Sequence, residues 1–176
     1  MYKKHQIILA SLSILIGVFC CLLRFRITAI SSDVISVVSI SSALYLAAFA
    51  GIQASSNLRE KLKEPDTIIP HRTQRFVLNC YFKVALVLNV VTIISVSASN
   101  MVADRIAQLD LLTNASLIQY ILDYALKRPV QPKERLSAWV WADFILNFSS
   151  TSLFVANLIQ MCFIGKFVVN RIPFDK

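Results

Sequence analysis

Glycine and proline are scarce in this chain, with three Gly and five Pro among 176 residues. An all-β fold needs turn residues between its many short strands, so this shortage argues against a sandwich or a barrel. It also leaves no Gly-rich or Pro-rich linker long enough to divide the chain. We therefore expect an undivided helical protein.

Charged residues are also few. They make up 16% of the chain, while hydrophobic residues make up 56% and the mean hydropathy is +0.63. Soluble globular domains have about a quarter charged residues and roughly 45–50% apolar residues. This balance argues against a water-soluble fold and favours a chain surrounded by lipid.

Familiar catalytic and cofactor motifs are missing as well. The sequence has no G-x-S-x-G, no H-E-x-x-H, no Walker lysine and no Gly-rich phosphate loop. His5 and His71 have no carboxylate or serine partner at a catalytic spacing, and the four cysteines have no metal-ligand spacing. We expect no enzyme activity, no metal and no cofactor, with the cysteines as apolar filler; palmitoylation of Cys80 stays open.

Four apolar runs are long enough to cross a bilayer, whose core of about 30 Å requires roughly 20 helical residues. They cover residues 7–23, 34–53, 84–102 and 139–164, separated by a basic loop at 54–83 and an outer loop at 103–136. The first run could be a cleaved signal peptide, but Leu22, Leu23 and Arg24 follow its apolar core in place of small residues. We predict an all-α polytopic membrane protein, with residues 1–176 in a single integral membrane domain.

Lys and Arg are divided unequally between the two sides of this topology. Eleven of the 18 lie on the side of the termini and loop 54–83, and seven lie on the other side. The positive-inside rule therefore predicts that both termini and loop 54–83 are cytoplasmic. We expect the membrane to be a bacterial inner membrane.

Positive charge in loop 54–83 is concentrated in one cluster. Its members are Arg59, Lys61, Lys63, Arg72 and Arg75. Anionic lipid headgroups attract such a cluster by about 1 kcal/mol per charge, and an acidic cytosolic partner would be attracted in the same way. Nucleic-acid binding is not expected despite the net charge of +8, because no basic motif is interleaved with aromatic residues.

Small residues recur every four positions along the second span. This small-residue ladder consists of Ser39, Ala43, Ala47, Gly51 and Ser55. In lipid, such a pattern indicates close helix packing. The first span offers Ala10, Gly17 and Cys21 as a partner, and the sequence leaves open whether the contact lies within one subunit or between subunits.

A polar stripe runs along the fourth span. Asp143, Asn147, Ser150 and Asn157 are spaced so that they return to one helical face. A charge in mid-bilayer costs roughly 2.5–3.5 kcal/mol, so this face should meet protein or water. It would line either the hydrogen-bonded interior of a bundle or a water-filled pathway between subunits. A smaller polar row in the third span is a candidate to pair with it: Asn89, Thr92, Ser95 and Ser99.

The outer loop contains a periodic segment from Asp104 to Lys127. Its apolar residues recur at three- to four-residue steps, which predicts one or two amphipathic helices. Such a segment would lie on the membrane surface or cover a neighbouring subunit, either as a lid or as the receiver of an external signal.

Three classes of function remain. The first is a small oligomeric membrane protein, acting as a sensor or a pore-type subunit and coupled to a cytosolic partner. The second is a passive anchor or scaffold for a cytosolic effector. The third, a membrane-embedded enzyme, lacks a base or metal set beside Asp143. We expect the first class, as a homo-oligomer.

The plan of four spans without a catalytic motif, a basic loop from Arg59 to Arg75 and an outer helix from Asp104 to Lys127 resembles the KwaA family. These are the membrane subunits of the Kiwa anti-phage defence system, and the likeness is architectural over most of the chain. It implies a tetramer in the bacterial inner membrane that detects phage attachment and works with a cytosolic DNA-binding partner, KwaB. Small four-span accessory proteins of CRISPR systems share the same outline.

Overall fold

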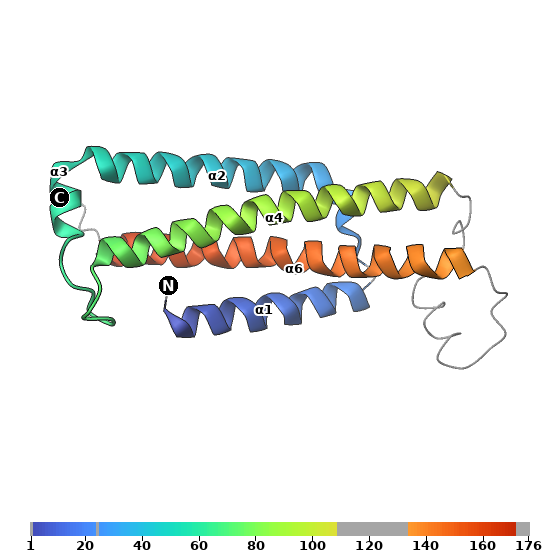
Figure 1. Cartoon of the computed structure of the whole chain (residues 1–176), viewed down its shortest axis with the longest axis horizontal. Coiled ribbons are helices and arrows are strands. Elements are labelled where there is room, and N and C mark those ends of the chain that lie inside the picture. Colours follow the sequence, from blue (N-terminus) through green and yellow to red (C-terminus); the bar gives the residue numbers. More distant parts are fainter. Residues whose placement is uncertain (1, 24, 109–133, 172–176) are drawn as a thin grey trace.

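The computed structural model describes residues 2–23, 25–108 and 134–171, and this part of the chain is helical. Its long helices are α1 (Lys3–Leu22), α2 (Ser31–Ala54), α4 (Gln74–Gln108) and α6 (Glu134–Arg171), joined by the 3-10 helix η1 (Ile27–Ile30) and the short helix α3 (Ser56–Lys61) (Figure 1). Four helices are long and apolar enough to cross a membrane. The predicted all-α polytopic fold is therefore confirmed.

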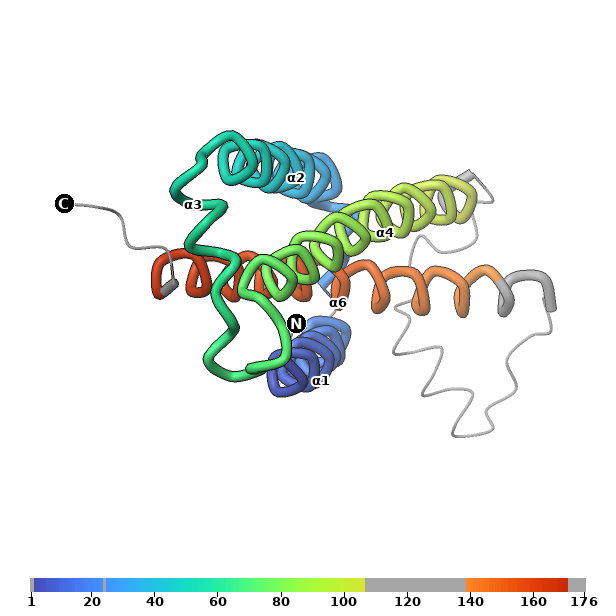
Figure 2. The backbone as a smooth tube through the Cα atoms, turned by 60° about the vertical axis from the view of Figure 1, so that its left-hand side comes forward, coloured from blue at the N-terminus to red at the C-terminus, as the bar shows by residue number. Residues whose placement is uncertain are grey.

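The helices α4 and α6 lie side by side at the centre of the bundle, and α1 and α2 flank them on opposite sides (Figure 2). In this arrangement α1 packs mainly on α6, and α2 packs mainly on α4. Within one subunit the first span therefore does not pack mainly on the second, and a pairing of the two between subunits stays a prediction. Gly17 of α1 lies against Ser152 of α6.

Two helices extend well beyond the predicted spans. The third begins at Gln74 instead of residue 84, and the fourth runs from Glu134 to Arg171 instead of 139–164. At 1.5 Å per residue, the 35 residues of α4 measure about 50 Å, more than the roughly 30 Å of a bilayer core. An apolar run in the sequence ends at its first charged residue, here Lys83. The helix itself starts nine residues earlier, at Gln74. It can include Lys83 because a lysine stem can lie along apolar surface with its ammonium in water.

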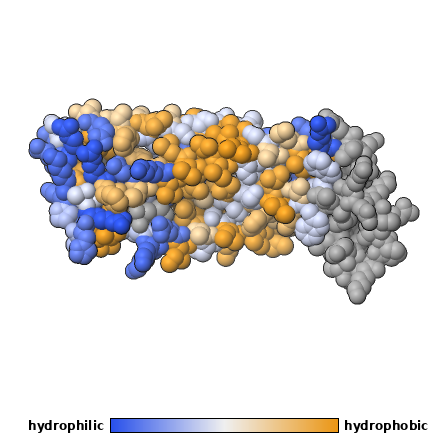
Figure 3. All heavy atoms as spheres, viewed as in Figure 1, coloured by the Kyte–Doolittle hydropathy of each residue, from blue (hydrophilic) through white to orange (hydrophobic). Residues whose placement is uncertain are grey.

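The charge-free parts of the helices define the membrane belt. On α4 this part lies between Lys83 and Asp104, and on α6 it lies between Asp143 and Lys166. Figure 3 shows a hydrophobic zone along the middle of the molecule, next to the hydrophilic end that holds α3. Exposed Leu15, Leu44 and Val87 belong to three different helices of this belt. These side chains face the lipid.

One end of the bundle gathers the start of α1, helix α3 and the last turns of α6 (Figure 1). We call it the cap end, and we call α3 together with residues 62–73 the cap. The opposite end holds η1 and the last turns of α4. The start of α1 and the end of α6 therefore lie at the same end of the bundle, as an even number of crossings requires.

Candidate functional site: the polar seam and the cap

A polar seam joins α4 to α6 in the middle of the membrane belt. The fully buried Ser150 hydroxyl lies 2.8 Å from Ser95 Oγ and 3.0 Å from Ser99 Oγ. Farther along, Asn157 Nδ2 donates to Thr92 Oγ1 at 2.6 Å. The polar row of the third span thus pairs with the stripe of the fourth, as the sequence suggested.

Two other buried amides extend this seam along α4, one on the side of α2 and one on the side of α6, and we include both in the polar seam. Asn89 does not face α6; its Nδ2 donates to Ser42 Oγ at 2.7 Å and lies 3.3 Å from Ser41 Oγ, which joins α4 to α2. Gln160, which the sequence analysis missed, donates from Nε2 to the Tyr81 carbonyl at 3.0 Å and is fully buried. Gln160 follows Asn157 by three residues, so extending the stripe by one turn would have found it.

The other two members of the stripe hold the connection between α1 and α2. Asn147 Oδ1 accepts from the Ile27 N–H at 2.9 Å, and its Nδ2 donates to the Phe25 carbonyl at 2.9 Å. Asp143 Oδ2 lies 3.6 Å from an Arg26 guanidinium nitrogen, whose side chain is 55% exposed. Such a long pair with one exposed partner contributes little stability. Asn147 is the stronger clamp on this turn.

The burial of the stripe bears on the two interpretations of it. Asp143, Ser150 and Asn157 are 7%, 0% and 3% exposed within a single chain. A surface between subunits would leave these residues open in one chain. Burial of these three side chains favours the bundle interior, while Asn147 is half-buried, and a pathway between subunits stays a prediction.

Helix α1 approaches α6 unusually closely at Gly17. A Cβ atom at this position would overlap the Ser152 hydroxyl and would lie 3.2 Å from Phe148 Cε2. The absence of a side chain is what allows the two backbones to come together.

The cap is a folded structure fastened to the N-terminal segment. Asp66, only 1% exposed, accepts a hydrogen bond from Tyr2 Oη at 2.7 Å through Oδ1. Its Oδ2 accepts from the Ile68 and Ile69 N–H groups at 3.1 and 2.8 Å, which closes a turn. The expectation of a simple loop at 54–83 missed this closure.

A second contact joins three long helices beside the cap. His5 Nδ1 and the Tyr81 hydroxyl are hydrogen-bonded, which links α1 to α4. The His5 ring also stacks on Phe163 of α6, with the ring centroids 4.2 Å apart. The cap end of α1 is therefore held by α4, α6 and the cap together.

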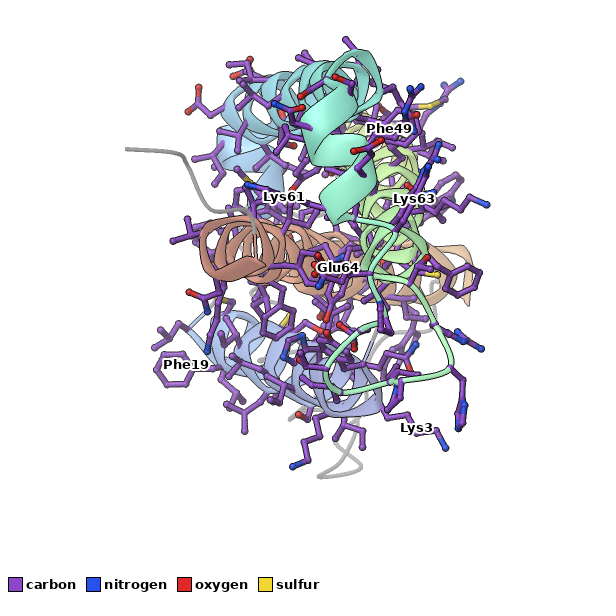
Figure 4. The ribbon with its side chains drawn as sticks, turned by 90° about the vertical axis from the view of Figure 1, so that its left-hand side faces the viewer. Lys3, Phe19, Phe49, Lys61, Lys63 and Glu64 are labelled. Atoms are coloured by element: carbon purple, nitrogen blue, oxygen red, sulfur yellow. The ribbon has the colours of Figure 1, made fainter. Side chains whose placement is uncertain are left out.

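The five basic residues of the predicted cluster have different surroundings. Figure 4 shows Lys61 and Lys63 at the cap end, and Arg59 is also exposed. Arg72 lies over the Phe76 ring at 4.6 Å, and Arg75, half-buried, donates to Gln53 Oε1 at 2.8 Å. Arg75 thus joins α2 to α4, and its predicted contact with a partner or lipid headgroups stays a prediction. The outward charge of the cap comes mainly from the others.

The small-residue ladder points away from the bundle. Ser39, Ala43, Ala47 and Gly51 are exposed, and a Cβ at Gly51 would meet open space. Buried Val38 and exposed Ala47 are nine residues apart, about two and a half turns, and so lie on opposite faces of α2. Ser55 instead caps α3 by accepting from the Leu58 N–H at 3.4 Å. Packing of the ladder within the subunit is wrong; packing between subunits stays a prediction.

The predicted amphipathic segment from Asp104 to Lys127 begins inside α4, which continues to Gln108. Residues 109–133 lie outside the described residues. Comparisons of the chain with protein-family models, curated proteins and solved structures find no match. The candidate site accordingly rests on the residues and contacts given above.

Proposed function

We propose that the protein is a sensor subunit of a bacterial inner membrane that passes an envelope signal to a cytosolic partner, as an anti-phage defence component would. The observation that carries this proposal is the attachment of α1 at both ends. Asn147 holds the turn after α1 at one end, and the Tyr2 hydrogen bond to Asp66 holds its start at the other. A displacement at the outer end is therefore mechanically connected to the cap.

The chemistry of the cap supports an acidic partner. Arg59 and Lys63 are exposed on a surface whose shape is fixed by buried Leu62 and Asp66. A fixed positive surface steers a negatively charged protein and sets its orientation. The KwaA resemblance suggests a partner of the KwaB kind, and anionic lipid headgroups are the competing occupant.

A sensor is favoured over a pore by the state of the seam. Ser95, Ser99 and Ser150 bond to one another across the α4–α6 contact. Hydrogen bonds across buried polar surface hold these helices together, and conduction would require them to separate. The pore version therefore needs a second, opened conformation.

Oligomerisation is part of the same proposal. The exposed ladder on α2 lets the backbone of a second helix approach closely, which is how membrane helices associate. A homo-oligomer joined through α2 would leave the cap of each subunit free for its partner. If the KwaA resemblance holds, the oligomer is a tetramer.

The experiment reverses charge on the cap. We expect Arg59→Glu combined with Lys63→Glu to weaken binding of the proposed cytosolic partner by roughly tenfold, equivalent to about 1.4 kcal/mol. Phage protection should fall with it, while membrane insertion is unchanged. Lys3→Glu combined with Lys4→Glu is the matched control, since it changes the charge equally on α1 and should preserve both. Unchanged binding and protection in the cap variant would contradict the proposal.

A passive anchor is the second candidate, and the exposed basic cap favours it. An anchor would use the charge of the cap but would not need the attachment of α1. The two candidates differ when the Tyr2 contact is removed and the cap charges are kept. An anchor would continue to support its effector, whereas a sensor would lose its signal.

A further inference from the structure

We infer that the polar seam binds water molecules inside the membrane belt, through the side-chain oxygens of Asn89, Asn157 and Gln160. These three amides are 1%, 3% and 0% exposed. The inference is independent of the proposed sensor function. It follows from the direction in which each neighbouring hydroxyl donates its hydrogen.

The hydroxyls beside the asparagines donate to their own helices. Ser41 and Ser42 both donate to the Val38 carbonyl, at 2.8 and 2.9 Å. Thr92 donates to the Leu88 carbonyl at 2.7 Å. With its single hydrogen used in this way, each of these oxygens accepts from a neighbouring amide.

This donation fixes the orientation of the amides. Asn89 must present its NH₂ group to Ser42, and Asn157 must present its NH₂ group to Thr92. The NH₂ group of Gln160 faces the Tyr81 carbonyl, which has no hydrogen to give. Turning any of the three amides around would place two acceptors against each other.

The carbonyl oxygens of the amides are left over. Asn89 Oδ1, Asn157 Oδ1 and Gln160 Oε1 are buried without a hydrogen-bond partner among the described residues. An unpaired buried acceptor costs about 1–3 kcal/mol. Lipid tails have no donor to offer, and a second subunit cannot reach atoms that are already covered. The missing donor must be small enough to lie inside the bundle.

Water fits these requirements better than a cation does. Buried waters in proteins typically make about three hydrogen bonds to polar groups that lack other partners. A cation needs several oxygens that converge on one point. Gln160 and Asn157 instead bond to Tyr81 and Thr92, which are eleven residues or about 16 Å apart along α4. Asn89 bonds to Ser42 on α2. Separate waters along the seam satisfy such a row.

The test is water-edited solid-state NMR of the full chain in lipid bilayers. Side-chain amides of Asn89, Asn157 and Gln160 should receive magnetisation from water nearly as fast as the exposed Asn57 amide of α3. They should do so well ahead of the backbone amide of fully buried Val96. The Gln160→Met variant identifies the Gln160 signal, because that signal disappears. Sequential backbone assignment identifies the other signals, and it also identifies the Gln160 signal if the variant does not insert into the membrane.

Two results would overturn the inference. Transfer to all three amides as slow as transfer to Val96 would mean that the seam is dry. Signals that shift when sodium and potassium are replaced by choline would mean that a cation, and not water, occupies the oxygens. Fast transfer that is indifferent to the salt supports bound water.

Discussion

Asn147 of α6 accepts a hydrogen bond from the backbone N–H of Ile27, 120 residues earlier in the chain, at 2.9 Å. Ile27 is the first residue of η1, where a helix start leaves donors without a partner inside the helix. The same amide donates to the Phe25 carbonyl, so one side chain satisfies two backbone groups of the turn. A residue of the last helix thereby determines how the first two are connected.

We expect Asn147→Ala to destabilise the protein, because both backbone groups of the turn lose their partner. The bond to the Ile27 N–H is part-buried and the bond to the Phe25 carbonyl is exposed to water, so we expect a loss of about 0.5–1.5 kcal/mol. Thermal unfolding in detergent measures the loss. Asn57→Ala on exposed α3 is the matched control and should stay within about 0.5 kcal/mol of the parent. Equal stability of the two variants would show that the clamp contributes nothing.

Gly17 provides a test of the α1–α6 contact. Gly17→Leu should destabilise the bundle by about 1–3 kcal/mol, because the new side chain meets Ser152 and Phe148. Gly165→Leu makes the same change where a Cβ would meet nothing within 4 Å, and it should be tolerated. If urea unfolding gives both variants the same stability, α1 does not pack on α6 as described.

The α2 ladder predicts the assembly surface. Ala47→Leu should lower the oligomeric state seen by native mass spectrometry, since a larger side chain keeps two α2 helices apart. The unfolding of the single chain should be unchanged, because Ala47 is exposed within it. Gly165→Leu adds a leucine at an exposed position of α6, outside the ladder, and should leave the oligomer intact. If the Ala47→Leu protein has the same number of subunits as the parent, the ladder is not part of the interface.

Tyr2→Phe separates a sensor from an anchor. The substitution removes the hydroxyl that donates to Asp66 but keeps the ring and the charges of the cap. We expect partner binding to persist and phage protection, measured by plaque counts, to be lost. Tyr45→Phe removes a hydroxyl from another buried tyrosine and should retain both properties. Full protection with Tyr2→Phe would favour the passive anchor.

Most of the fold could be predicted because hydrocarbon imposes a simple rule on composition. A run of about 20 apolar residues has few alternatives to a membrane helix, so all four helices were found. The polar stripe was found for the same reason, since residues such as Ser150 and Asn157 are costly in lipid and their spacing gives the face. Periodicity alone predicts which residues share one face of a helix. It does not predict which other helix packs against that face.

The cap and the helix pairing could not be predicted for this reason. The ladder indicated that α2 has a close-packing face, but nothing in Ala43 or Ala47 says whether the neighbour is α1 or a second subunit. The turn at Asp66 had a local signal, because Asp often accepts from N–H groups two or three residues onward. Its bond to Tyr2 joins residues 64 positions apart, and no local pattern contains that information.

Labelling from the two sides of the membrane tests the central claim, that the chain crosses lipid four times with the cap on the cytoplasmic side. Lys63→Cys and Asp104→Cys, each in a chain without native cysteines, place exposed thiols before α4 and in its last turns. A membrane-impermeant maleimide should label Lys63→Cys in inverted vesicles and Asp104→Cys in intact spheroplasts. Labelling of both thiols from the same side, or of Lys63→Cys from outside, would contradict the account.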